Sequence, residues 1–372
     1  MSSNRFSSFL KKNIKLKLFL YYLVCFFLFD YFFGQKFLNY AYKNKILQNA
    51  NTKLKMINKN EKEYRISHPV FHHTLKKNMN IESQWGEFRY RTCTDKNGFR
   101  IHCNEIKKYN DEFILIGDSF TEGIGLNYEK TFAGMLSKKL TINFHNMGVA
   151  SYSPSIYKKK INFFLKKKII EPKGVLVFID ISDIDDEFYY YDCKNNESIC
   201  SKHDDNISNT INKVDNPKIN FPVYKKIKAV IRKTKRKFFP KVHSYEKNYH
   251  RSYWTYSKRN DKVNTGITSA IKNMNDLYLF LESKNIPLSL AVYPWPGQIL
   301  YDKQESLQVK IWRDFCISRC KNYINLFPEF FEEIKTSSEK LVVKKYYLKN
   351  DVHFNEEGNK KIFNKLIEID LF

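Results

Sequence analysis

Short strand candidates recur along the chain and alternate with stretches of helical spacing. The strand candidates lie at 112–116, 142–146, 175–179, 287–292 and 323–327, of which 175–179 is apolar throughout, and the helical stretches lie at 131–140, 155–168, 272–283, 308–321 and 355–367. A strand that is apolar on both faces belongs to a sheet with both sides covered. The alternation therefore indicates an α/β fold with a mostly parallel sheet between helices.

Two regions do not follow this alternation. In the first, 66–110, we expect short strands and turns, with Asn97-Gly98 as a turn signal. The second, about 188–260, is an irregular insertion that contains an Asn/Asp-rich run and a basic helix candidate at 224–239. A chain of 372 residues can form one large domain or two ordinary ones. We expect one domain over 66–372 that carries this variable insertion.

The stretch 18–34 is apolar except for Asp30, and its length is near the lower limit for crossing a bilayer. Asp30 lies close to one end, where its carboxylate can reach the headgroups. Basic residues flank both sides, namely Arg5, Lys11, Lys12, Lys15 and Lys17 before it and Lys36, Lys43 and Lys45 after it. This asymmetry favours a cytoplasmic N-terminus only weakly. A cleaved signal peptide, the alternative, ends in small residues, whereas Phe and Tyr fill this region.

We therefore expect an uncleaved transmembrane signal-anchor at 18–34. Residues 1–17 would be a basic cytoplasmic tail, and residues 35–65 a stalk or helix leading away from the membrane. The domain that follows would lie in the periplasm or an equivalent space outside the inner membrane.

The formal net charge of +25 would suit a nucleic-acid or acidic-membrane partner. Lys, Asn, Ile, Phe and Tyr are abundant throughout, however, as an AT-rich genome would produce, and the charge is not gathered beside aromatic stacking motifs. We expect no nucleic-acid partner. The basic stretch 224–239 has apolar residues on one side and fits an anionic membrane, an acidic polymer or, as the plainer alternative, a solvated helix at the rim of the sheet.

Six of the seven cysteines fall into close pairs, which are Cys93 and Cys103, Cys193 and Cys200, and Cys316 and Cys320. Local pairing is typical of an oxidising compartment, so we expect three disulfides. Scattered reduced thiols, the alternative, would place the domain in the cytosol. No Cys-x-x-Cys spacing or Cys/His array is present, so we expect no metal site and no cofactor.

Two short motifs carry residues suited to nucleophilic catalysis. Gly117-Asp118-Ser119 follows the strand candidate 112–116 and precedes a helix, which places a serine in the crevice at the carboxyl ends of the strands. Asp351-Val352-His353 lies just before the final helix. A serine hydroxyl needs a base to remove its proton, and an imidazole oriented by a carboxylate is such a base. Separately, the first motif could be an ordinary turn and the second a loop hydrogen bond.

With these motifs, residues 90–370 resemble the SGNH/GDSL hydrolase superfamily, and the insertion lies outside the resemblance. The resemblance implies a three-layer α/β/α fold of flavodoxin-like type, with Ser119 as nucleophile and His353 and Asp351 completing a triad. Many members place the Asp three residues before the His. Here Asn350 holds that place and Asp351 is two before, a spacing similar to that of alginate-acetylation enzymes.

The family's oxyanion hole is the part that this sequence alters most. Members supply backbone N–H groups from the nucleophile and from a Gly in a second block, and a side-chain amide from an Asn in a third. By position the second block is 146–153, where Ser151 replaces the Gly and Gly148 lies near, and the third is 180–187, where Ser182 replaces the Asn. Losing one such donor costs about 3–4 kcal/mol of transition-state stabilisation. A substitute donor or a reduced rate is implied, or Ser182 is simply a turn residue.

Three further groups of residues have plain interpretations. The acidic run Asp180, Asp183, Asp185, Asp186 and Glu187 fits turn and helix-start chemistry better than a cation site. The turn Tyr293-Pro-Trp-Pro-Gly297 either lines the cleft or is a rigid turn. His68, His72, His73 and His102 lack metal-ligand spacing and are expected to be surface or satisfied histidines.

The motifs, the export signal and the basic surface together favour an esterase that removes an acyl group, most simply acetyl, from a cell-envelope glycan or a small ester. An O-acetyltransferase with the same acyl-enzyme is the first alternative, and it would need a separate membrane protein as acyl donor. A glycan-binding accessory protein with a decayed site is the second. The sequence does not identify the acyl group, the polymer or the role of the insertion.

Overall fold

The computed structural model describes residues 14–43, 64–104, 111–140, 142–189, 221, 223–224, 227–228, 251–257 and 259–369. The chain divides into two compact units, of which one comprises Met1–Leu54 with Asp205–Val242 and the other Lys55–Asp204 with His243–Phe372. The predicted Cys193/Cys200 pair lies outside the described residues, as does most of the predicted insertion.

The described part of the smaller unit is dominated by one helix, α2 (Ile14–Lys43). Its window Lys17–Gly34 has a mean hydropathy of 1.5 and is long and apolar enough to cross a membrane. The helix continues to Lys43, into the region predicted as a stalk or helix.

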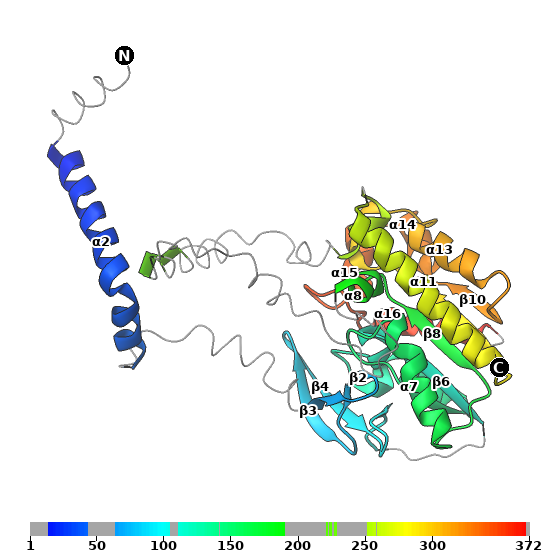
Figure 1. The fold of residues 1–372 in the computed structure, drawn as a ribbon. Helices are drawn as coiled ribbons and strands as arrows, with labels where there is room; N and C mark the ends of the chain where they lie inside the picture. The colour runs from blue at the N-terminus through cyan, green and yellow to red at the C-terminus, as the bar shows by residue number, and fades with distance from the viewer. Residues whose placement is uncertain are drawn as a thin grey trace. The chain divides into compact units, whose positions relative to one another are not determined.

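The larger unit contains a sheet of eight strands in the order β10-β9-β8-β6-β7-β5-β4-β3. The strands are β3 (Asn80–Trp85), β4 (Phe88–Thr94), β5 (Arg100–Ile101), β6 (Glu112–Gly117), β7 (Asn143–Asn146), β8 (Val175–Ile179), β9 (Leu288–Val292) and β10 (Asn322–Asn325). From β10 to β7 all neighbours pair parallel, and β3, β4 and β5 add antiparallel pairs at one edge. The predicted mostly parallel α/β fold is confirmed (Figure 1).

Helices cover both faces of this sheet. The connecting helices are α6 (Phe132–Lys139), α7 (Pro154–Lys166), α8 (Asp183–Tyr189), α11 (Asp261–Glu282), α13 (Leu307–Cys316) and α16 (Glu356–Ile367). Because crossovers are right-handed and the strand order reverses at β6, α6 lies on one face and α7 on the other. Accordingly α11 packs against α7 and α8, whereas α16 packs against α6. The reversal puts the carboxyl end of β6 at the crevice where α/β folds bind ligands.

The sequence located most elements within a few residues but missed several helices. α11 begins at Asp261, well before the predicted 272, because Asn260 caps it through the N–H of Val263. Short helices α12 (Pro296–Tyr301), α14 (Phe327–Ile334) and α15 (Glu339–Tyr346) were not predicted. The first two start at or beside a proline. A proline in the sequence predicts a turn, but it is equally suited to the first turn of a helix, so these helices were missed.

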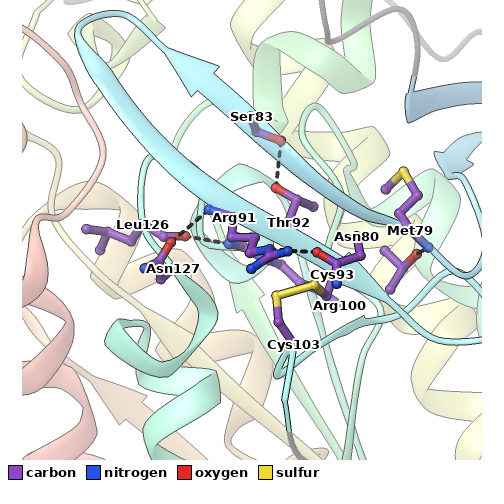
Figure 2. Close-up of a disulfide and its surroundings, with 11 residues drawn as sticks. Met79, Asn80, Ser83, Arg91, Thr92, Cys93, Arg100, Cys103, Leu126 and Asn127 are labelled. Atoms are coloured by element: carbon purple, nitrogen blue, oxygen red, sulfur yellow. Dashed lines mark hydrogen bonds between the residues drawn. A yellow bond between two sulfur atoms is a disulfide. The ribbon is translucent and has the colours of Figure 1, made fainter.

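A disulfide joins two parts of the antiparallel edge, and hydrogen bonds link this edge to Leu126 and Asn127 in the segment after α5 (Ser119–Glu122) (Figure 2). Cys93 of β4 forms a disulfide with Cys103, which follows β5. Arg100 of β5 is buried and donates to the carbonyl oxygens of Glu122 and Leu126. A second disulfide joins Cys316 and Cys320 at the end of α13. Two of the three predicted pairs are therefore present among the described residues.

A small hairpin of β1 (Arg65–His68) and β2 (His72–Leu75) precedes the large sheet. Arg65 donates two hydrogen bonds, of 2.6 and 2.8 Å, to the buried carboxylate of Glu122. The same carboxylate accepts the N–H of Ala150 at 2.8 Å. Glu122 thus joins the hairpin, the turn after β6 and the second block.

Candidate active site

Ser119 stands where β6 ends and the short helix α5 (Ser119–Glu122) begins. Gly117 has no room for a side chain, since a Cβ there would lie 2.3 Å from the hydroxyl oxygen of Thr121. Asp118 caps the helix by accepting the N–H of its second residue at 3.0 Å. The N–H of Ser119, in the first turn, has no partner within the helix. The Gly-Asp-Ser sequence therefore builds a tight strand-to-helix turn that leaves the serine at the crevice.

The structure brings Ser119, His353 and Asp351 into one hydrogen-bonded chain. His353 Nε2 lies 2.8 Å from Ser119 Oγ, and His353 Nδ1 is hydrogen-bonded to Asp351 Oδ1. The same carboxylate oxygen accepts the backbone N–H of His353 at 3.0 Å, which the two-residue spacing permits. The serine and the histidine are 234 positions apart in sequence. This geometry suits transfer of a proton from the hydroxyl to the imidazole.

The charges around His353 favour its protonated form. Burial alone lowers the pKa of His353, but the charge and hydrogen bond of Asp351 outweigh it, with help from Asp118 and Asp180, so the pKa is raised above 6.5. Burial raises the pKa of Asp351, and the contacts with His353 and Trp85 overcome this and lower it. Asp351 is therefore ionised and stabilises the imidazolium that forms when the serine loses its proton.

Trp85 is a member of the site that the sequence analysis missed. It ends β3 and donates from Nε1 to Asp351 Oδ2 at 2.9 Å, across 266 positions of sequence. Its ring meets that of His353 edge to face, with centroids 5.4 Å apart. The indole N–H binds the second oxygen of the Asp351 carboxylate, and the indole ring contacts His353. Both contacts limit the orientations of the Asp351 and His353 side chains. No local signal marks this role, because the contact depends on how the edge hairpin packs.

The second block is held from two sides. His73 Nε2 lies 2.8 Å from the carbonyl oxygen of Ala150, whose N–H is bound by Glu122. The next residue, Ser151, has φ +64, the left-handed conformation that glycine adopts readily. Serine thus keeps the backbone shape expected of glycine at this position. The N–H of Gly148 donates to Asn146 Oδ1 at 3.0 Å, so Gly148, an expected oxyanion donor, has its amide already engaged.

The third block is likewise fixed by hydrogen bonds. The N–H of Ser182 donates to Asp180 Oδ1 at 2.7 Å, so the Ser182 hydroxyl is the possible donor at the position where the resemblance places an amide. Arg251 donates to the carbonyl oxygen of Ser182 at 2.9 Å and pairs with Asp186 at 2.6 Å. Trp254 donates to the carbonyl oxygen of Ile181 at 3.1 Å.

Arg251 and Trp254 come from the end of the predicted insertion, which lies outside the resemblance. Both donate to backbone carbonyl oxygens of residues 181 and 182, so the segment 251–257 packs directly against the third block. No local sequence signal marks these contacts, since the partners are 69 and 73 positions apart.

Three buried carboxylates lie behind the serine. Asp118, Asp180 and Asp183 each place one oxygen within 4.8 Å of the others, close enough for a cation. Protein donors take several of these oxygens, including the N–H of Phe120 on Asp118 Oδ1 at 3.0 Å and Tyr157 OH on Asp183 Oδ2 at 2.9 Å. Burial and the charge of Asp180 raise the pKa of Asp118 to about 8 and raise that of Asp183 well above its ordinary value. Protons shared among the carboxylates can thus relieve their repulsion.

The aromatic turn after β9 reaches the same carboxylates. Trp295 Nε1 donates to Asp180 Oδ2 at 2.6 Å, and Tyr293 OH donates to Asp118 Oδ1 at 3.3 Å. Of the four upstream histidines, His68 stacks on Phe71 and the others are hydrogen-bonded.

The sequence matches no known family model and no curated protein. Solved structures resemble it at a distance. A member of the lipolytic G-D-S-L family from Veillonella parvula is 13% identical over 70% of this chain and 97% of its own, with a TM-score of 0.39. A catalytic mutant of an acetylxylan esterase from Geobacillus stearothermophilus is 11% identical over 71% and 95%, with a TM-score of 0.37. An alpha/beta hydrolase enzyme from the metagenome of Lake Arreo is 9% identical over 70% and 95%, with a TM-score of 0.39. These likenesses are too distant to transfer a function to this chain.

Proposed function

We propose that this protein is a serine esterase that cleaves acyl esters, most simply acetyl esters, on a cell-envelope glycan or related conjugate. The observation that carries the proposal is the chain from Ser119 Oγ through His353 to Asp351, with the 2.8 Å contact between the hydroxyl and the imidazole. A serine between a base and an oriented carboxylate is suited to acyl transfer.

In the proposed reaction Ser119 Oγ attacks the ester carbonyl while His353 Nε2 takes the hydroxyl proton. The tetrahedral oxyanion is stabilised by the N–H groups of Ser119 and Ser151 and by the Ser182 hydroxyl. His353 then gives its proton to the leaving alcohol, and the acyl group stays on Ser119. A water molecule, deprotonated by His353, attacks the acyl-enzyme, which releases the acid and restores the serine.

We also propose that α2 holds the domain at the inner membrane as a single-pass anchor, with the site on the extracytoplasmic side. The apolar window of α2 and the Cys93–Cys103 and Cys316–Cys320 disulfides support this placement. The proposed domain organisation of tail, anchor, stalk and insertion-bearing hydrolase domain follows from it.

The experiment is hydrolysis of p-nitrophenyl acetate by the full chain, purified in detergent. We expect turnover that Ser119→Ala abolishes and that Ser283→Ala leaves unchanged, since Ser283 is exposed at the end of α11. Equal background rates for the wild type and Ser119→Ala would refute catalysis. The glycan-binding protein would then be the remaining alternative, and the serine at 182 in place of the family's oxyanion amide supports it. If an oligosaccharide acceptor becomes acetylated during turnover, the protein is instead an O-acetyltransferase.

A further inference from the structure

One stripe of α2 is covered while the rest of its apolar surface is exposed. Large side chains such as Phe32, with 64% of its surface exposed, point outward, but Asp30 is fully buried and Gly34, one turn later, is buried too. Phe26 and Phe27, one turn earlier, are half-buried. Positions four residues apart share a helix face, so these residues mark a single contact surface.

The residues that cover Asp30 lie almost two hundred positions later in the chain. Val223 and Tyr224 are helical, and their backbone N–H groups donate to Asp30 Oδ1 and Oδ2, each at 2.7 Å. A carboxylate that accepts successive N–H groups is acting as a helix cap. Around it the Phe221 ring lies 5.0 Å from that of Phe27.

This contact fixes the depth of both partners. Asp30 is four residues before the end of the window Lys17–Gly34, or about 6 Å at 1.5 Å per residue. At that depth a carboxylate is satisfied either by reaching the headgroups or by donors within the protein, and in the structure it has two donors from the protein. Any N–H that satisfies Asp30 therefore lies in the apolar part of the membrane or at its boundary.

We propose that Phe221, Val223 and Tyr224 enter the bilayer beside α2 and are held there by the carboxylate of Asp30, so that this part of the insertion is a second membrane contact. The proposal rests on the anchoring role of α2. Ile227 and part of Tyr224 remain exposed, at 43% and 39%, and these apolar surfaces suit lipid, while the Tyr224 ring also lies 5.4 Å from that of Phe27 on α2. The Lys228 ammonium lies 5.8 Å from the Tyr224 ring centre, and its long side chain can reach the headgroups.

The test reconstitutes the full chain in nanodiscs and measures quenching of tryptophan emission by lipids brominated on their acyl chains. Phe221→Trp is the reporter, and Tyr224→Trp is a second one at another position of the same contact, since both rings pack on Phe27, at 5.0 and 5.4 Å. Phe32→Trp, on the exposed face of α2, reports the bilayer, and Tyr301→Trp, 59% exposed in the larger unit, reports water. The parent chain with its four tryptophans gives the background.

We expect the reporters at 221 and 224 to lose emission as the one at 32 does, while the one at 301 does not. Adding Asp30→Ala should remove the loss at 221 and leave that at 32 intact. Quenching at 32 without quenching at 221 or 224 would overturn the proposal while the anchor stands. Absence of quenching at all three would overturn the anchor and the proposal together, and quenching at 221 that survives Asp30→Ala would overturn the role of Asp30.

Discussion

The two halves of the site differ in how they are built. The attacking half, Ser119 with His353 and Asp351, follows the resemblance closely and is completed by one added contact from Trp85. The proposed oxyanion half has Ser151 and Ser182 in place of the expected Gly and Asn. Hydrogen bonds nevertheless hold the backbone at both positions, through Ala150 beside Ser151 and through Arg251 on the carbonyl oxygen of Ser182. The two proposed halves thus differ in their side chains at the expected positions, whereas hydrogen bonds hold the backbone in both.

These hydrogen bonds favour a site in use over one in decay. A decayed site would have no reason to keep a left-handed backbone at a serine, which costs about 1–2 kcal/mol. It would also have no reason to keep a pair between the partly exposed Arg251 and the buried Asp186 beside the third block. Substitutions in each half test this difference.

The largest effect is expected in the attacking half. His353→Ala should lower kcat for p-nitrophenyl acetate by about 10^4-fold or more, because the serine loses its base. The double variant Ser119→Ala/His353→Ala should be no slower than either single variant, since the residues act as a unit. Additive losses in steady-state kinetics would show that they do not.

In the oxyanion half, Ser182→Ala should lower kcat by about 10- to 100-fold with little change in KM, because a transition-state donor is removed. Ser182→Asn, which restores the family's amide, is the matched control and should match or exceed the wild type. Unchanged kcat in Ser182→Ala would remove Ser182 from the proposed oxyanion hole.

Arg251→Ala should lower kcat by less, about 10-fold, by loosening the third block, and should also destabilise the fold. The pKa of Asp186 is raised by burial to about 7 even with Arg251 beside it. Without that partner the folded state binds the proton more tightly, so stability falls as pH rises from the ordinary carboxyl range through neutrality. Below about pH 7 Asp186 holds its proton in both folded proteins, so thermal melts should show the deficit against the wild type growing as the pH rises above about 7, and Arg251→Lys should recover part of it. A deficit independent of pH would contradict the assigned pairing.

Trp85→Phe should lower kcat/KM a few-fold and shift the acidic limb of its pH profile to higher pH. Activity requires neutral His353, whose pKa is raised, so activity is lost as pH falls through that value. Removing the indole N–H leaves Asp351 a stronger acceptor for the imidazolium, which raises the pKa of His353 further. A limb that stays in place while kcat/KM falls would limit Trp85 to packing.

The smallest effect is expected from Ser151→Gly. It should leave kcat unchanged and stabilise the fold by up to about 1 kcal/mol, because glycine adopts the left-handed backbone at φ +64 without strain. Urea denaturation checks the stability. Destabilisation together with a loss of kcat would mean that the serine side chain itself has a role.

The sequence predicted what is encoded locally. It placed the strand before Ser119 and the turn around it, and it placed Asp351 and His353 on one loop, because each of these features lies within a few residues. Trp85, Arg251 and Trp254 could not be predicted, because each meets its partner only after the sheet has closed and the chain has returned from the insertion. Likewise, the acidic residues of the third block predicted a turn and a helix start. Only the packing of the fold brings Asp118 beside Asp180 and Asp183.

The most direct measurement is to trap the covalent intermediate. The full chain is mixed with p-nitrophenyl acetate, quenched in acid within the first turnover and digested, and its peptides are identified by mass spectrometry. We predict an acetyl group on the peptide that contains Ser119, located on Ser119 by fragmentation and absent from Ser119→Ala. Turnover with no acetylated peptide, or with the acetyl group on another residue in both proteins, would contradict a Ser119 acyl-enzyme.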